Sequence, residues 1–129
     1  MSLINTHDTA GSAIEEPKYN WGVEATIAVI GGKWKPLILY ELKDGTLRFS
    51  QLQDRVEPRI TQRMLTKELR QLEADGLVAR KVYPQVPPKV EYSLTEKGGS
   101  IMPILNLLCH WGEEHLSDRI RYRCDGEDE

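Results

Sequence analysis

The stretch from Thr61 to Asp75, TQRMLTKELRQLEAD, constrains the fold of this chain more than any other. At about 100° per residue, Leu65, Leu69 and Leu72 fall within about 60° of one another, so one face of a helix would be apolar. The opposite face carries three cations, which are Arg63, Lys67 and Arg70. The pattern therefore predicts a helix that packs on a core through its leucines and presents positive charge on its other side.

A shorter helix and a break precede this stretch. Residues Gln51–Val56 form the shorter predicted helix, and Ser50 is its candidate N-cap. Pro58 disfavours helical geometry at the residue before it and so separates the two helices. Thr61 is the candidate N-cap of the second helix, and Gly76 lies at its expected end. A short helix, a break and a helix with outward basic residues form the layout of a helix-turn-helix motif.

Two alternating segments follow the amphipathic helix. Leu77–Tyr83 and Lys89–Leu94 each place successive side chains on opposite faces, which predicts two antiparallel strands. The proline-rich loop PQVPPK joins them. A hairpin directly after such a helix is a wing, and we expect its tip to cover Tyr83–Lys89. A polyproline ligand is the alternative for these prolines, but the run is short and lies between strands.

The remaining segments predict further helices around this unit. Val23–Ile30 has amphipathic spacing and ends at two glycines, and Lys33–Leu42 is nearly apolar all round, so it is the expected buried helix. Thr46–Phe49 reads as a connector or a short strand, and Thr95 caps a last helix. The predicted fold is mainly α with a small antiparallel β hairpin, a winged helix-turn-helix with extra N-terminal and C-terminal helices.

The last helix carries more apolar residues than one buried face requires. We expect one of its sides to pack on its own domain and another on a second copy of the chain. A deeply buried helix in a monomer is the alternative. The residues expected at a homodimer interface are Val23, Ile27, Ile101, Ile104, Leu105, Leu108 and Trp111.

Length and charge bound the class of protein. The 129 residues suit one domain, divided into a flexible N-terminal segment (1–18), the winged-helix domain (19–116) and an acidic tail (117–129). The formal net charge is −3, yet residues 59–89 hold seven basic and three acidic side chains, a net of +4. The residues after Gly112 hold three basic and seven acidic ones, a net of −4. No signal peptide or membrane span is evident, so we expect a cytoplasmic protein with one basic face.

These segments together resemble the HxlR family of bacterial winged helix-turn-helix transcription regulators. The pieces that carry the resemblance are VIGGKWKPLIL at Val29–Leu39, the pair Arg48-Phe49, the run at Ile60–Val78, the wing at Val82–Gly98, and PIL…W at Pro103–Trp111. The resemblance implies a homodimer, built through the terminal helices, on a palindromic operator. Many relatives carry a cysteine just before the Val-Glu that opens the first helix. This chain has Trp21-Gly22 there, so that thiol switch is not expected.

The side chains expected to bind DNA follow from their chemistry. Gln62, Arg63 and Thr66 suit base edges, whereas Lys67 and Arg70 suit phosphates. Lys33 is expected at a helix N-terminus, where free backbone N–H groups favour an anion. The full set is Lys33, Arg59, Thr61, Gln62, Arg63, Thr66, Lys67, Arg70, Lys81 and Lys89. The alternative is a winged-helix module that binds protein, which the acidic total charge favours slightly.

The sequence gives little support for enzyme activity, metal binding or a phosphate-binding loop. His110 and His115 lie about 140° apart on a helix, so they do not converge as catalytic groups or metal ligands. Trp34 stands where a phosphate loop needs Ser or Thr. The two cysteines, Cys109 and Cys124, predict no disulfide framework, and we expect Cys109 to be buried and inert. The expected partners are double-stranded DNA and a second copy, with no enzyme activity, metal or cofactor. The operator and any small-molecule effector are not identified by the sequence.

Overall fold

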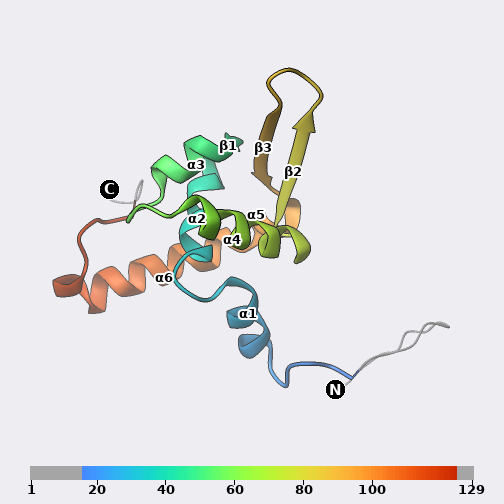
Figure 1. Ribbon diagram of the computed structural model, residues 1–129. Helices are drawn as coiled ribbons and strands as arrows, with labels where there is room; N and C mark the ends of the chain where they lie inside the picture. Colours follow the sequence, from blue (N-terminus) through green and yellow to red (C-terminus); the bar gives the residue numbers. More distant parts are fainter. Residues whose placement is uncertain (1–15, 125–129) are drawn as a thin grey trace.

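The computed structural model describes residues 16–124, which form a small helical body with a protruding β hairpin (Figure 1). Most of the predicted N-terminal segment therefore lies outside the described residues. The elements in chain order are α1 (Gly22–Ile30), α2 (Lys35–Glu41), the 3₁₀ turn η1 (Leu42–Asp44), β1 (Leu47–Arg48), α3 (Phe49–Arg55), α4 (Gln62–Ala74), β2 (Val78–Tyr83), β3 (Lys89–Leu94), α5 (Glu96–Ser100), α6 (Met102–His115) and the 3₁₀ turn η2 (Ser117–Arg119). The mainly helical fold with a small antiparallel sheet is confirmed.

The sheet has three strands in the order β1-β3-β2, one more than the predicted hairpin. β2 pairs with β3 from Val78 opposite Leu94 to Tyr83 opposite Lys89, and Leu47 of β1 lies opposite Tyr92. β1 comes directly before α3 in the chain. The short strand therefore joins the middle of β3 to the first helix of the helix-turn-helix.

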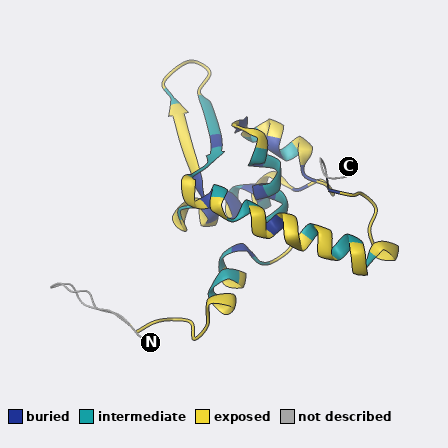
Figure 2. Ribbon diagram, turned by 180° about the vertical axis from the view of Figure 1, so that it is seen from behind, coloured by how far each residue is buried: buried dark blue, intermediate teal, exposed yellow. Residues whose placement is uncertain are grey.

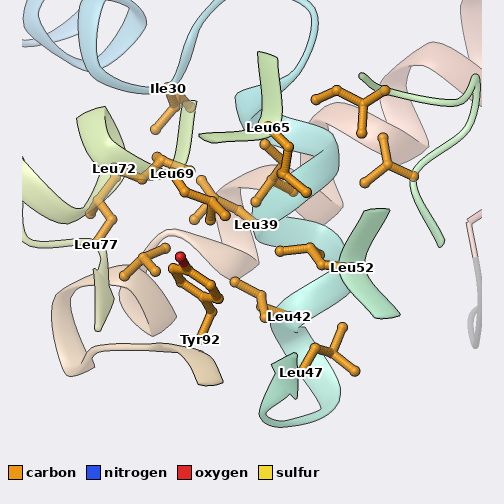
Figure 3. Packing of buried hydrophobic residues seen from close by; sticks show 14 of the residues in the cluster. Ile30, Leu39, Leu42, Leu47, Leu52, Leu65, Leu69, Leu72, Leu77 and Tyr92 are labelled. Atoms are coloured by element: carbon orange, nitrogen blue, oxygen red, sulfur yellow. The ribbon is translucent and has the colours of Figure 1, made fainter. Parts of the chain in front are cut away.

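The core lies where the leucine face of α4 meets α2 and the sheet. Figure 3 shows Leu65, Leu69 and Leu72 of α4 pointing inward toward Leu39 and the other buried residues. Tyr92, from the middle of β3, closes the cluster on the sheet side. All three leucines are almost completely buried, as the periodicity predicts. Burying a leucine contributes about 1.5–3 kcal/mol, so this face sets the rotation of α4 about its own axis.

Two helix starts differ from the predicted ones. α2 begins at Lys35 rather than Lys33, because Pro36 occupies the first helical turn and Trp34 is the N-cap. α3 begins at Phe49, so Ser50 lies inside the helix and is not its N-cap. The Gln51 side chain performs part of the cap instead, since its Oε1 accepts the Arg48 backbone N–H at 2.9 Å.

The predicted last helix is two helices. Thr95 does act as an N-cap, accepting the Gly98 N–H at 2.9 Å, but it caps the five-residue α5. The chain then bends at Ile101, and α6 begins with Pro103 in its first turn. Gly98 packs so closely on the Leu77 carbonyl that an added Cβ would lie 2.0 Å from its oxygen. This close approach fixes where α5 leaves the sheet.

Apolar residues remain exposed on α1 and α6. Figure 2, seen from behind, shows α6 with exposed residues along its outward face. The large exposed side chains on these two helices are Val23, Ile27, Ile104, Leu107, Leu108 and Trp111. Leu105 differs from the predicted interface set, because it is buried in the core of its own chain. Ile101 is half-buried against the same core.

The cysteines form a disulfide between Cys109 of α6 and Cys124 beyond η2. The prediction of no disulfide framework is therefore wrong, and Cys109 is half-buried and bonded where a buried, inert side chain was expected. The two cysteines lie 15 positions apart in the sequence, and the segment between them includes the end of α6 and η2, which together turn the chain back on itself. The first part of the predicted acidic tail is thus tied to α6 as far as Cys124.

Replacing Leu65 by alanine tests whether the leucine face holds the fold. Leu65 is completely buried, so Leu65→Ala should lower the free energy of unfolding by about 2–5 kcal/mol. Urea denaturation followed by circular dichroism measures the change. Val86→Ala is the matched control, because Val86 is 97% exposed at the tip of the wing and should cost almost nothing. Equal effects of the two changes would contradict this account of the core.

Candidate nucleic-acid interface

The N-terminal end of α4 is fixed by Thr61, as the sequence predicts. The Thr61 hydroxyl accepts the Met64 backbone N–H at 3.1 Å, which satisfies one of the free donors of the first turn. Ile60, just before the cap, is completely buried. The helix therefore starts at a point that is anchored on both its polar and its apolar side.

The outward face of α4 carries the three predicted cations. Arg63, Lys67 and Arg70 are all exposed and, within the described part of the chain, form no ion pair or side-chain hydrogen bond. Together with Gln62 and Thr66 they line one open groove along the helix. We name this set, Gln62, Arg63, Thr66, Lys67 and Arg70, the α4 groove. Its charge faces solvent while the leucines behind it face the core.

A second hollow lies between α4 and the sheet. It has a volume of about 300 Å³, and its lining includes Arg70 of α4, Arg80 of β2 and Tyr92 of β3. Arg80 is exposed and extends the positive surface from the helix onto the wing. The DNA-binding residues predicted from the sequence do not include Arg80. Strand alternation places Arg80 on the face of β2 opposite to Lys81. Only the packing of β2 on α4 shows that this face of the strand lies next to Arg70.

A buried ion pair holds α4 against α2. Lys35 Nζ lies 2.9 Å from Glu68 Oε1, and the two side chains are only 12% and 11% exposed. The same ammonium group donates a hydrogen bond of 2.5 Å to Gln71 Oε1, one turn further along α4. Glu68 is buried at the edge of the leucine face, so a lone carboxylate there would be costly. Lys35 therefore joins the start of α2 to two successive turns of α4.

The threonines of the predicted set are occupied within the helix itself. Thr61 serves as the N-cap, and the Thr66 hydroxyl donates to the Gln62 carbonyl at 2.8 Å. Gln62 is exposed and free to reach outward. Among the predicted base-contacting residues, Gln62 and Arg63 thus have side chains with no internal role.

The remaining predicted cations each have a partner. Arg59 Nη1 lies 3.1 Å from Asp54 Oδ1 at an exposed site, where such a pair contributes little to stability. Lys33 lies two residues before the start of α2, and its ammonium group stacks 4.8 Å from the ring of Trp34. Lys33 therefore lies directly before the N-cap of α2 and not inside its first turn.

The lysines of the wing surround one tyrosine. Lys81 Nζ lies 5.0 Å and Lys89 Nζ 4.6 Å from the ring of Tyr83, both close enough for a cation–π contact. Lys89 also lies 3.5 Å from Glu91 Oε2. The Tyr83 hydroxyl donates to Glu91 Oε1 at 2.9 Å, and this hydrogen bond, with Lys89 nearby, lowers the pKa of Glu91. The wing thus has its own polar network, which holds both lysines close to the hairpin.

The far end of α4 is joined to the C-terminal helices. The Thr95 hydroxyl donates to the Gly76 carbonyl at 2.5 Å while it caps α5, and Lys97 Nζ donates to the Asp75 carbonyl at 2.9 Å. Gly76 adopts a positive φ of 78°, as expected for the residue that ends the helix. Both ends of α4 are therefore fixed to neighbouring elements.

Removing the charge of Glu68 tests the link between α2 and α4. Glu68→Gln keeps the shape of the side chain but leaves the buried Lys35 ammonium group without a counter-ion. We expect a loss of about 1.5–3 kcal/mol in the free energy of unfolding, measured by urea denaturation. Glu73→Gln, on the exposed side of the same helix, is the control and should change stability little. The account fails if both variants unfold at the same urea concentration.

Comparison with known proteins places this arrangement in one family. The model of the HxlR-like helix-turn-helix family matches residues 29–120. A protein of Methanothermobacter thermautotrophicus described as an uncharacterised HTH-type transcriptional regulator is 56% identical over 117 residues, which cover 91% of this chain and 88% of that protein. YtcD of Bacillus subtilis, described in the same words, is 57% identical over 104 residues, covering 81% of this chain and 82% of YtcD.

A solved structure is also similar to this chain. The redox regulator HypR in its reduced form superposes with a TM-score of 0.69 at 52% identity, covering 76% of this chain and 98% of the HypR chain. The described part of our chain contains no helix long and apolar enough to cross a membrane. The matched segment, residues 29–120, includes all of α2 to α6 and the whole wing. The protein is accordingly a member of the HxlR-like helix-turn-helix family.

Proposed function

We propose that this chain is a transcriptional regulator that binds a palindromic DNA operator as a homodimer, with α4 in the major groove. The observation that carries the proposal is the two-sided α4, whose buried leucines turn three unpaired cations outward along one open groove. The second helix of a helix-turn-helix motif enters the major groove and contacts base edges with its first residues. The relatives described above bear the names of transcriptional regulators.

Base reading falls to the first turn of α4. Gln62 and Arg63 are exposed and have no partner within the described residues, so both are available to the groove floor. Arginine forms two hydrogen bonds with the O6 and N7 atoms of guanine, and glutamine does the same with adenine. Thr66, whose hydroxyl is held by the helix backbone, offers its methyl group to a thymine methyl instead.

Phosphate binding falls to the cations further along and beside the helix. Lys67 and Arg70 flank the reading residues, and Arg80 continues the positive surface onto β2. Lys81 and Lys89 on the wing, Arg59 before α4 and Lys33 before α2 are the outer contacts of the proposal. Their present partners are two half-buried aromatic rings, Trp34 and Tyr83, and carboxylates such as that of exposed Asp54, which phosphates would replace. Such contacts fix the register of the protein on DNA and do not read sequence.

The homodimer is proposed to form through α1 and α6. Both helices expose large apolar side chains, and a single chain of this size has little left to cover them. Leu108 and Trp111 lie one turn apart on α6, and Ile27 of α1 adds to the apolar surface. A two-fold dimer then presents two α4 helices to half-sites about 34–36 Å apart, or a multiple of that distance.

Binding assays on two α4 variants test the DNA contacts. Selection from a random duplex pool with the purified protein yields a preferred sequence, and affinity for it is measured at increasing salt. Arg63→Ala should cost about 1–3 kcal/mol at one base pair and relax the preference there. Lys67→Ala should weaken all duplexes alike and reduce the salt slope by about 0.9.

The wild-type chain supplies the control against the alternative function. A winged-helix module that binds protein would show weak binding to any duplex and almost no dependence on salt. That result would sink the proposal. If Arg63→Ala and Lys67→Ala behave identically, DNA binding stands but the assignment of reading and phosphate roles is wrong.

The proposed dimer has its own test. Leu108→Asp places a charge on the exposed apolar face of α6 and should convert the dimer to a monomer without unfolding the chain. Sedimentation at several concentrations measures the mass, and circular dichroism checks the fold. Val86→Asp at the wing tip is the control and should leave the dimer intact. A monomeric wild-type chain at micromolar concentration would refute this part of the proposal.

A further inference from the structure

Three side chains with metal-binding atoms meet where the chain turns back after α6. They are Cys109 and Glu113, one turn apart on α6, and Cys124, which returns to them beyond η2. The two sulfurs and a carboxylate oxygen all lie within 4.8 Å of one another. None of these three residues belongs to the α4 groove or to the proposed DNA contacts.

The Glu113 carboxylate is held in a defined position beside the sulfurs. Its side chain is only 10% exposed, although it carries a charge. Its Oε2 accepts the backbone N–H of Cys124 and lies 3.9 Å from Cys109 Sγ, while its Oε1 lies 3.8 Å from Arg123 Nη2. Cys124 is buried. A half-buried carboxylate beside two sulfurs is unlike its exposed neighbour Glu114.

We propose that Cys109, Cys124 and Glu113 form a zinc-class divalent metal site when the disulfide is reduced. Two thiolates and one carboxylate are ligands that Zn²⁺ accepts, and three protein ligands leave a fourth position for water. With Zn–S near 2.3 Å and Zn–O near 2.0 Å, tetrahedral geometry puts sulfur and oxygen about 3.5 Å apart. The spacing between Cys109 Sγ and Glu113 Oε2 is close to this, so the pair on α6 is nearly placed for the ion.

The charge of the three ligands also favours a divalent cation. Two thiolates and a carboxylate carry three negative charges, which a divalent cation and the Arg123 guanidinium together neutralise. The two sulfurs are bonded in the disulfide and must separate to about 3.8 Å around a tetrahedral zinc ion. Cys124 lies beyond η2, outside any helix or strand, so this movement needs no change in α6.

The metal-bound and disulfide states exclude each other. A dithiol reductant supplies two electrons, breaks the S–S bond and yields two thiols, while the dithiol itself becomes a disulfide. Binding of Zn²⁺ then releases the two thiol protons. In either state the segment 116–123 stays closed against α6, where Arg121 and Tyr122 line a hollow with Glu57 and Pro58 of the turn before α4. The ion thus holds the tail beside that turn in a reducing environment.

Cobalt binding to the full chain tests this site. Co²⁺ added to the reduced protein should bind one ion per chain and give the intense near-ultraviolet band of thiolate-to-cobalt charge transfer. Zn²⁺ should displace it. The oxidised chain, identical in sequence, should show no such band. Absence of the band in the reduced chain, or equal metal affinity in both redox states, overturns the proposal and leaves a disulfide only.

Variants then identify the ligands. Cys109→Ser and Cys124→Ser should each reduce the band by at least half, and affinity should fall by more than the roughly 10–100-fold that loss of an outer-shell partner causes. Glu113→Gln should keep the two-thiolate band but weaken affinity. Glu114→Gln, the exposed neighbour, is the matched control and should change nothing. Circular dichroism checks that each variant is folded. Wild-type affinity in Glu113→Gln would remove the carboxylate from the site.

Discussion

The burial of one row of leucines on α4 is the interaction on which the rest of the structure depends. Leu65, Leu69 and Leu72 meet residues of α2, η1 and the sheet, and no other rotation of the helix would bury all three (Figure 3). Because a helix has two opposite faces, the same packing turns Arg63, Lys67 and Arg70 outward. Fold and positive surface are thus two results of a single hydrophobic contact.

Polar contacts make that rotation specific. Apolar packing alone tolerates small rolls and slides, whereas an ion pair of defined length does not. Lys35 contacts both Glu68 and Gln71. These two contacts fix the rotation of α4 about its own axis and its position along that axis relative to α2. Buried pairs of this kind are poor sources of net stability, and their best-supported role is to select one arrangement. In this chain, that selection fixes the direction in which the cations of α4 point.

Local chemistry explains what could be predicted from the sequence. The α4 face, its Thr61 cap and the bounds of β3 depend on neighbours within a few residues, and these predictions are confirmed. At the start of α2, the cap of α3 and the bend at Ile101, the sequence offers more than one residue that could begin a helix. The packing of the folded chain decides which one does. The Cys109–Cys124 pair and the approach of Arg80 to Arg70 depend on distant segments meeting. No periodicity in the sequence carries that information.

The Thr95 hydroxyl has a mechanical consequence. It bonds at once to the carbonyl that ends α4 and to the N–H that starts α5, and Lys97 repeats the connection at Asp75. The α5–α6 unit is therefore connected directly to the C-terminal end of α4. Any tilt of α5 and α6 would therefore be passed to the C-terminal end of α4. In the proposed dimer, joined through α6, such a tilt would reach the α4 helix of each copy through the contacts of Thr95 and Lys97.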